Sequence, residues 1–163
     1  MVTTSQIRAL VQSVPANKTL GLEVLQTDDG FAQVAVTVPT AMTGVTGSLH
    51  TGGLVDIVDA AGLAAILSTC PKATPARNVV PTGAAAVFDF LAPAHGRLIG
   101  SCSLSEATRT TLRQFWFEQV HHVKIMAFAA VSDTTGEEVC RASFGWSLHR
   151  DLARSAAREL HVV

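Results

Sequence analysis

The sequence has little charge of either sign, because only 15% of its 163 residues are Asp, Glu, Lys or Arg. The formal net charge is −1, so the composition gives no reason to expect nucleic acid as a partner. Hydrophobic residues make up 48%, more than a typical monomer of this size needs, which indicates an interface between copies of the chain. The length suits one domain, expected over residues 1–163 with its core at about 20–148.

The features of exported and membrane proteins are also missing. The first residues contain no basic segment followed by an apolar block, so a signal peptide is not expected. The longest apolar run carries two aspartates and is broken by Gly62, so no bilayer-spanning segment and no membrane partner are expected. Three widely spaced cysteines, an odd number, favour free thiols in a reducing compartment, and hence a cytoplasmic protein: Cys70, Cys102 and Cys140.

What the sequence does contain is a glycine-rich approach followed by a long apolar run, together spanning residues 44–68. The run over 54–67 is too long for one strand and lacks a polar stripe, so it predicts a helix buried on nearly all sides. Only Asp56 and Asp59 place charge in it. Because a lone carboxylate is costly to desolvate, each must be paired, neutralised or used in chemistry.

Alternating apolar and polar residues on both sides of this run predict antiparallel strands. The spacing of apolar residues in 4–14 predicts a short amphipathic helix that Pro15 closes, and the tail 149–163 has the pattern of a frayed surface helix. A sheet wrapped around one central helix, an α+β fold, buries all of these apolar faces. The strands are expected within 22–27, 31–38, 79–92, 97–104, 123–131 and 139–148, the first two joined by a turn at 28–30.

Residues 105–122 have the least regular pattern. Their aromatic and β-branched content favours an extension of the neighbouring strands into a long hairpin, with a loop over a site as the alternative. The cluster Phe115-Trp116-Phe117 suits core or interface packing, and could also line a pocket for an acyl or aryl group.

The stretch Gly47-Ser48-Leu49-His50-Thr51-Gly52-Gly53, followed by Asp59 nine positions after His50, resembles the hotdog superfamily. More narrowly, it is similar to the acyl-CoA thioesterases of the phenylacetate-pathway and hydroxybenzoyl-CoA kind, which share this spacing. The segment 90–94 resembles the strand end and turn of the same family. The resemblance implies a hotdog fold, in which an antiparallel sheet wraps around one long central helix. It also implies thioester hydrolysis without a metal or redox cofactor.

The resemblance also implies roles for individual residues. Asp59 would be the general base or nucleophile, acting across a dimer interface on a thioester held at the neighbouring subunit's helix start. The first amides of a helix lack internal partners, so Thr51, Gly52 and Gly53 would donate to the carbonyl oxygen as it becomes negative. His50 would orient the substrate or hydrogen-bond the loop. Structural alternatives stay open, because the glycines could serve close packing and Asp59 could be a paired carboxylate.

Three departures from the family pattern concern this site. Thr51 stands where many members have glycine, so it keeps the amide but crowds the site. Gly44 stands where an asparagine often lies six residues before the histidine, and the serine or threonine that often assists from the next strand falls near Gly83, with Thr82 adjacent. We expect Asp56, Thr82 and Gly83 near the substrate, although Asp56 could equally complement the helix dipole.

The expected substrate is a medium-chain or aromatic acyl thioester of coenzyme A or a carrier protein, bound by a homodimer or a dimer of dimers. A non-hydrolytic acyl-binding protein is one alternative, favoured by the departures above. An enoyl-thioester hydratase or dehydratase is another, for which His50 and Asp59 could supply the acid and base. Four arginines are candidates to meet coenzyme A phosphates: Arg77, Arg97, Arg109 and Arg113. Four further histidines show no metal-ligand spacing, so no metal is expected: His95, His121, His122 and His149.

Overall fold

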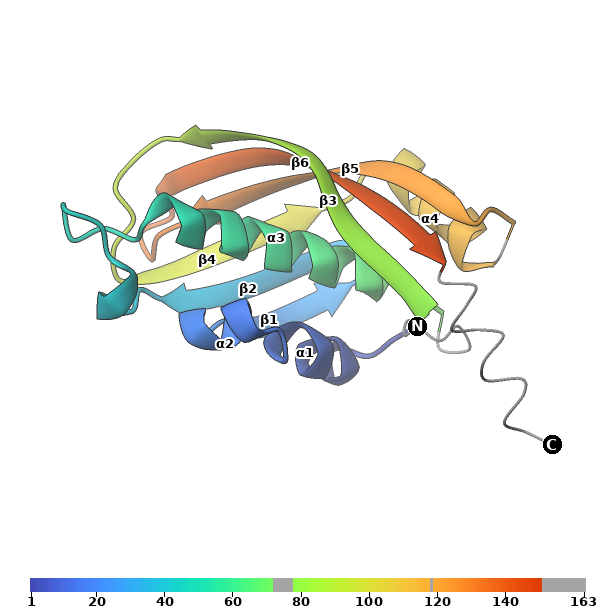
Figure 1. Cartoon of the computed structure of the whole chain (residues 1–163), viewed down its shortest axis with the longest axis horizontal. Coiled ribbons are helices and arrows are strands. Elements are labelled where there is room, and N and C mark those ends of the chain that lie inside the picture. Colours follow the sequence, from blue (N-terminus) through green and yellow to red (C-terminus); the bar gives the residue numbers. More distant parts are fainter. Residues whose placement is uncertain (72–77, 118, 151–163) are drawn as a thin grey trace.

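One antiparallel sheet of six strands wraps around a central helix (Figure 1). The computed structural model describes residues 1–71, 78–117 and 119–150. The strand order is β1-β2-β4-β5-β6-β3, and each strand is antiparallel to its neighbours. The expected α+β class and the expected strands are therefore confirmed. The strands are β1 (Glu23–Asp28), β2 (Phe31–Thr37), β3 (Val79–Phe90), β4 (Arg97–Ser103), β5 (His122–Ser132) and β6 (Glu138–Arg150).

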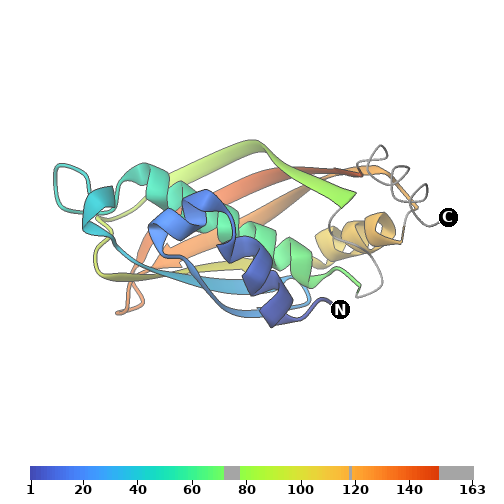
Figure 2. The ribbon, with the colours of Figure 1, turned by 60° about the horizontal axis from the view of Figure 1, so that its bottom comes forward.

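The central helix α3 (Thr51–Ser68) lies in the curve of the sheet, and two N-terminal helices cover it from outside (Figure 2). These are α1 (Thr4–Gln12) and α2 (Pro15–Leu20), which are separate helices because proline suits the first position of a helix. Pro15 therefore begins a second helix after the first has ended. The short 3₁₀ helix η1 (Thr40–Met42) follows β2 and leads toward the start of α3.

The predicted central helix is confirmed, and it packs mainly against β2, β4 and β5. Gly100 of β4 permits this approach, since a Cβ at that position would lie 2.4 Å from Ile57 Cγ2. The helix is not buried on nearly all sides, which corrects the expectation from the apolar run. A stripe along one side of the helix is only half-buried, because β3 lies too far round the sheet to cover it. The residues of this half-buried stripe are Val55, Asp56, Asp59, Leu63 and Leu67.

By length and composition alone, α3 is long and apolar enough to cross a membrane, which corrects the expectation that no segment would be. Such a helix is weak evidence for a membrane span, because the core helix of a folded domain has the same composition. Here most of α3 is buried against the sheet.

Residues 105–122 are not a strand extension or a loop, because they form the helix α4 (Glu106–Trp116) and the start of β5. Ser105 caps α4 by accepting a hydrogen bond from the Thr108 N–H at 3.1 Å. The side chains at 112, 115 and 116 are buried and share one helix face, so their spacing outweighs the strand preference of the aromatic residues. Phe115 and Trp116 pack in the core, whereas Phe117 is exposed.

The first two residues of the predicted tail helix are not helical. His149 and Arg150 are instead the last two residues of β6. The Arg150 side chain is held there by a hydrogen bond from Nη2 to the Phe115 carbonyl oxygen, 2.6 Å away. The rest of the predicted tail helix lies outside the described residues. The expectation of a single domain over 1–163 stays a prediction.

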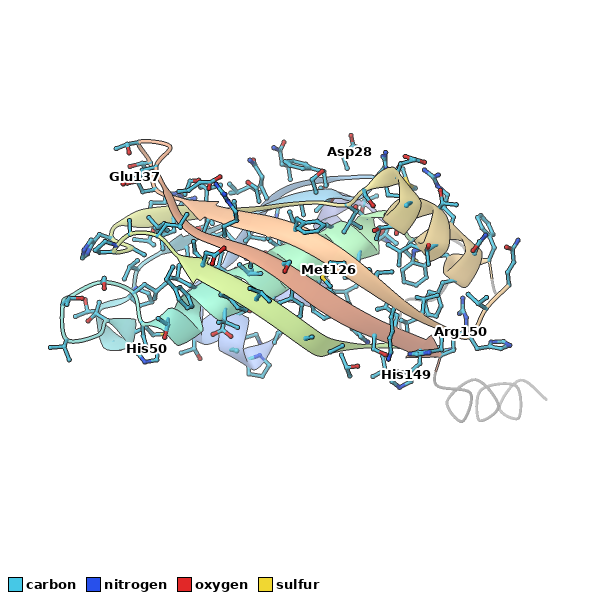
Figure 3. The ribbon with its side chains drawn as sticks, turned by 90° about the horizontal axis from the view of Figure 1, so that it is seen from above. Asp28, His50, Met126, Glu137, His149 and Arg150 are labelled. Carbon is cyan, nitrogen blue, oxygen red and sulfur yellow. The ribbon has the colours of Figure 1, made fainter. Side chains whose placement is uncertain are left out.

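The edge strand β3 and the outer face of the sheet carry apolar residues that no other described residue covers. Most residues of β3 are exposed, and β3 pairs with β6 on one side only. In Figure 3, which looks onto the outer face, Met126 lies between His50 near one end and Arg150 near the other. One row of the outer face crosses five strands by register and alternates large and small side chains: Phe31, Ser103, Phe128, Ser143 and Val87.

Candidate active site

The start of α3 is organised by His50, which is the N-cap residue. Its Nδ1 accepts a hydrogen bond from the Gly52 N–H at 3.1 Å, and its carbonyl oxygen accepts one from the Gly53 N–H at 2.8 Å. The His50 N–H donates to the Met42 carbonyl oxygen at 2.8 Å, which ties the helix start to η1. Two of the three amides predicted as oxyanion donors are thus engaged within the chain.

Thr51 provides the remaining amide. Within residues 1–71, 78–117 and 119–150, no group accepts a hydrogen bond from its N–H. Thr51 and Gly52 are exposed, as a site that receives a ligand requires. Gly53 differs, because a Cβ there would lie 2.6 Å from Leu49 Cδ1, so its lack of a side chain also serves packing of the loop. The free donor at the helix start is therefore the Thr51 N–H.

The carboxyl of Asp59 lies on the half-buried stripe of α3. Burial raises its pKa to about 6, and the negative charge of Asp56 adds to the shift. Burial also raises the pKa of Asp56 from its usual value. In the described part of the chain neither carboxylate has a hydrogen bond or an ion pair, so no arginine neutralises Asp59 there. A carboxylate with these properties can take up a proton near neutral pH.

Thr51 and Asp59 of one chain are too far apart to act on the same atom. They are eight residues apart on one helix, a separation of roughly 12 Å along its axis at 1.5 Å per residue. His50 is one residue further from Asp59, so a histidine–aspartate pair does not form within one chain. The proposed base and the proposed oxyanion donor therefore lie on one helix, but too far apart to contact the same substrate atom.

Thr82 and Gly83 of β3 lie on opposite faces of the sheet. The Thr82 hydroxyl donates to the Ser147 carbonyl oxygen at 3.2 Å. Gly83 is paired with Trp146 of β6, whose buried side chain lies on the face toward α3. The structure thus brings Gly83, rather than the Thr82 side chain, to the side of the sheet that Asp59 occupies.

The arginines proposed for phosphate binding have carboxylate partners within the chain. Arg97 pairs with Glu23 at 2.9 Å. Arg109 and Arg113 both pair with Asp29, at 3.5 and 3.3 Å, and both also pair with Glu106. Their charge is largely compensated, so none of the three stands out as a phosphate ligand. Arg77 lies outside the described residues.

The three cysteines are buried thiols that form no disulfide, as predicted, and are poor nucleophiles. Burial raises the pKa of Cys70 to about 11 and that of Cys102 to about 12, so both stay protonated at neutral pH. Among the described residues, no three His, Cys, Asp or Glu side chains lie close enough together to hold a metal ion. Among the described residues, Asp59 has the pKa shift best suited to accepting a proton near neutral pH.

An apolar cavity of about 170 Å³ lies beyond Asp59 along the same stripe of α3. Leu63 and Leu67 form one wall, four and eight residues after Asp59, and Trp116 of α4 contributes another. The sequence indicated such a pocket only as an alternative role for the cluster 115–117, of which Trp116 lines the cavity, because four elements other than α3 complete it. Its remaining lining residues are Leu10, Ile66, Val79, Pro81 and Leu148.

No protein-family model matches the chain, and no curated protein matches its sequence. Solved structures do match in fold. A Pseudomonas aeruginosa protein described as a probable thioesterase has a TM-score of 0.74 at 18% identity, covering 91% of this chain and 97% of its own. The PaaI protein of the E. coli phenylacetic acid degradation operon has a TM-score of 0.64 at 20% identity, covering 90% and 95%. A Haemophilus influenzae thioesterase has a TM-score of 0.71 at 14% identity, covering 93% and 94%.

Two of these neighbours are described as thioesterases, one of them as probable, and the chain shares their fold, which is the hotdog fold that the stretch 47–59 led us to expect. At these identities the likeness concerns the fold, so the activity is argued below from the chain's own residues.

Proposed function

We propose that the protein is an acyl-CoA thioesterase whose active site forms between two copies of the chain. The observation that carries the proposal is Asp59, a carboxylate on the half-buried stripe of α3 with no ion pair to any described residue, whose pKa burial raises to about 6. A carboxylate in this range suits general-base catalysis at neutral pH. The free Thr51 N–H at the helix start supplies the second requirement, a donor for the oxygen that becomes negative.

A second copy is needed because one chain cannot bring Thr51 and Asp59 together. If two α3 helices pack antiparallel along their half-buried stripes, Asp59 of one copy approaches Thr51 of the other. The free edge of β3 supports this pairing, since a long exposed edge strand readily adds another strand. Two sheets joined at β3 would form one continuous sheet over both helices.

The outer face of that sheet supports a dimer of dimers. Phe128 is 60% exposed and Val87 66% exposed, and each stands next to a serine in the row that crosses five strands. Beside Phe128 lies a hollow that Ser101, Ser103 and Ala130 help to line. A protruding ring next to a hollow on one patch is what a two-fold contact between identical faces requires.

The proposed reaction follows from these groups. Asp59 accepts a proton from a water molecule whose oxygen attacks the thioester carbon, and the carbonyl oxygen becomes negative while accepting a hydrogen bond from the Thr51 N–H. The carbonyl then re-forms as the C–S bond breaks, and the departing thiolate takes the proton that Asp59 had accepted and leaves as a thiol. In the nucleophilic alternative, the Asp59 carboxylate attacks the carbon and expels the thiolate, and water then cleaves the acyl-aspartate anhydride to the free acid, which restores the carboxylate. Neither route uses a metal or a redox cofactor.

The substrate we propose is a medium-chain or aromatic acyl thioester of coenzyme A or a carrier protein. The cavity next to Leu63 supports the acyl part, because it is apolar and begins one helical turn beyond Asp59. Three buried cysteines without a disulfide support a reducing compartment, so we propose a cytoplasmic location.

A non-hydrolytic acyl-binding protein is the second candidate. The observation that favours it is the Gly52 N–H, which His50 already occupies, leaving one free amide where an oxyanion hole commonly has two donors. The hydratase alternative is less supported, because His50 already uses its Nδ1 to cap the helix start.

The test is turnover of a panel of acyl-CoA esters by the wild type and by Asp59→Asn. The thioesterase proposal expects hydrolysis by the wild type and a loss of about 10²–10⁴-fold in kcat for the variant. Tight binding of acyl-CoA with no turnover by either protein favours the binding function instead, and undiminished turnover by the variant removes Asp59 from the mechanism.

A further inference from the structure

The two tryptophans of the chain differ in how their indole N–H groups are satisfied. Trp116 Nε1 donates to Thr69 Oγ1 at 2.8 Å in the core. Trp146 is only 3% exposed, and its Nε1 has no hydrogen-bond acceptor in the described part of the chain. Buried donors in native proteins are nearly always paired, so an unpaired one requires an explanation. For Trp146 a partner supplied from outside the chain is such an explanation.

Three neighbours of the Trp146 indole have no side chain that could accept its proton. On the helix side, Nε1 lies 3.0 Å from the Cβ position of Gly62, and on the sheet its register partner in β3 is Gly83. Neither glycine offers a side chain, and the ring next along β6 is Phe144, 5.0 Å away between centroids. Two glycines and an aromatic ring thus border the indole, and none of these side chains accepts a hydrogen bond.

Trp146 is also close to the proposed catalytic carboxylate. Gly62 follows Asp59 by three residues, so their Cβ positions are about 5–6 Å apart on one flank of α3. The indole nitrogen is therefore at most about 9 Å from the Asp59 Cβ, since it lies 3.0 Å from the Gly62 Cβ position. A thioester carbon attacked from Asp59 would lie between the two, with the next acyl carbons within reach of the N–H.

We propose that Trp146 is a specificity residue whose N–H donates to an oxygen near C3 of the acyl group. This inference rests on the proposed thioesterase function and narrows its substrate to acyl thioesters with a 3-oxo or 3-hydroxy group. Such an oxygen satisfies the buried donor, whereas a plain hydrocarbon chain leaves it unpaired. A site built to pair a polar group discriminates strongly against the analogue that lacks the group.

The experiment compares pairs of acyl-CoA esters of equal chain length, with and without the C3 oxygen. Wild type is expected to show a kcat/KM about 10–100-fold higher for the oxygenated member, by analogy with other buried hydrogen-bonding sites. In Trp146→Phe the ratio should fall close to one while hydrolysis of the plain ester is kept. Phe117→Leu is the control, because Phe117 is an exposed aromatic residue at the end of α4 that lines neither the acyl cavity nor the surroundings of Trp146, and it should keep the preference.

Gly62→Ala is a second variant, used with thermal unfolding in case Trp146→Phe does not fold. Its Cβ would press on the indole at Nε1, so it should also lower the preference for the oxygenated ester. An unchanged ratio in both folded variants overturns the inference, as does an equal loss on both esters, which would mean that the N–H is paired by the second copy of the chain.

A failure of the thioesterase proposal is recognised separately. If the wild type hydrolyses no ester, calorimetry with non-hydrolysable thioether analogues of coenzyme A still tests Trp146. Binding about tenfold tighter for the 3-oxo analogue, lost in Trp146→Phe, would support the donor role without hydrolysis. Equal affinity for both analogues would overturn it.

Discussion

His50 Nδ1 accepts the Gly52 N–H at 3.1 Å, so the histidine of the Gly-x-x-His-x-Gly-Gly stretch is a helix cap. Replacing it with alanine leaves that amide without a partner at the start of the helix. We expect His50→Ala to lower the free energy of unfolding by about 0.5–2 kcal/mol, measured by urea denaturation. His50→Asn, whose side-chain oxygen can accept the same hydrogen bond, should recover most of the loss. If both variants are as stable as the wild type, the cap contributes nothing to folding.

The raised pKa of Asp59 predicts how the free energy of unfolding changes with pH. Its pKa is about 6 in the folded chain and 3.8 as a free group, so the folded state binds the proton more tightly. The protonated form is favoured by folding, hence this contribution is fully present below about pH 4 and is lost as the pH rises through about 6. We expect a loss of roughly 1–2 kcal/mol over that interval, after discounting for partial exposure. Asp59→Asn should lack this component in chemical denaturation from pH 4 to 7, and an identical pH dependence in both proteins contradicts the raised pKa.

The Thr51 amide can be removed without removing the helix. Thr51 is the first residue of α3, a position where proline is tolerated because its N–H needs no helical partner. We expect Thr51→Pro to lower kcat by about 10²–10³-fold with little change in melting temperature. Thr51→Gly keeps the N–H and serves as the control, with activity near or above that of the wild type. Equal losses in both variants would point to the hydroxyl instead.

A substitution of Phe128 tests the proposed dimer of dimers. Phe128→Ser removes the large ring from the outer-face row, so we expect tetramers to become dimers in light scattering while the activity per chain is kept. Phe117→Ser is the control, because Phe117 is exposed to a similar extent but lies at the end of α4. A tetramer that persists in Phe128→Ser means that this face is not the contact.

Much of the fold was predictable because its signals are local in sequence. Alternation identified the strands, and the apolar run identified α3. Residues 105–122 were predicted wrongly because the helical spacing of three apolar residues, 112, 115 and 116, competed with a strand-like composition. The half-buried stripe of α3 was missed for a different reason, since it depends on how far the sheet wraps round the helix.

The candidate site likewise has features that were predictable from the sequence and features that were not. Asp59 and the helix start could be proposed from one short stretch, because their spacing along a helix is a local property. The unpaired Trp146 N–H could not, since it results from three distant elements that meet at Gly62, Gly83 and Phe144. Likewise, the capping of Gly52 by His50 is a matter of side-chain orientation, which residue type alone does not specify.

The claim on which the account depends is that Asp59 of one copy acts with Thr51 of another, and subunit complementation measures this most directly. Asp59→Asn and Thr51→Pro are each expected to be nearly inactive alone. Dimers reassembled from an equal mixture should regain about a quarter of the wild-type activity, because half of them are mixed and each mixed dimer has one intact site under two-fold symmetry. A mixture of folded, exchanging subunits that stays as inactive as its components would contradict a site shared between copies.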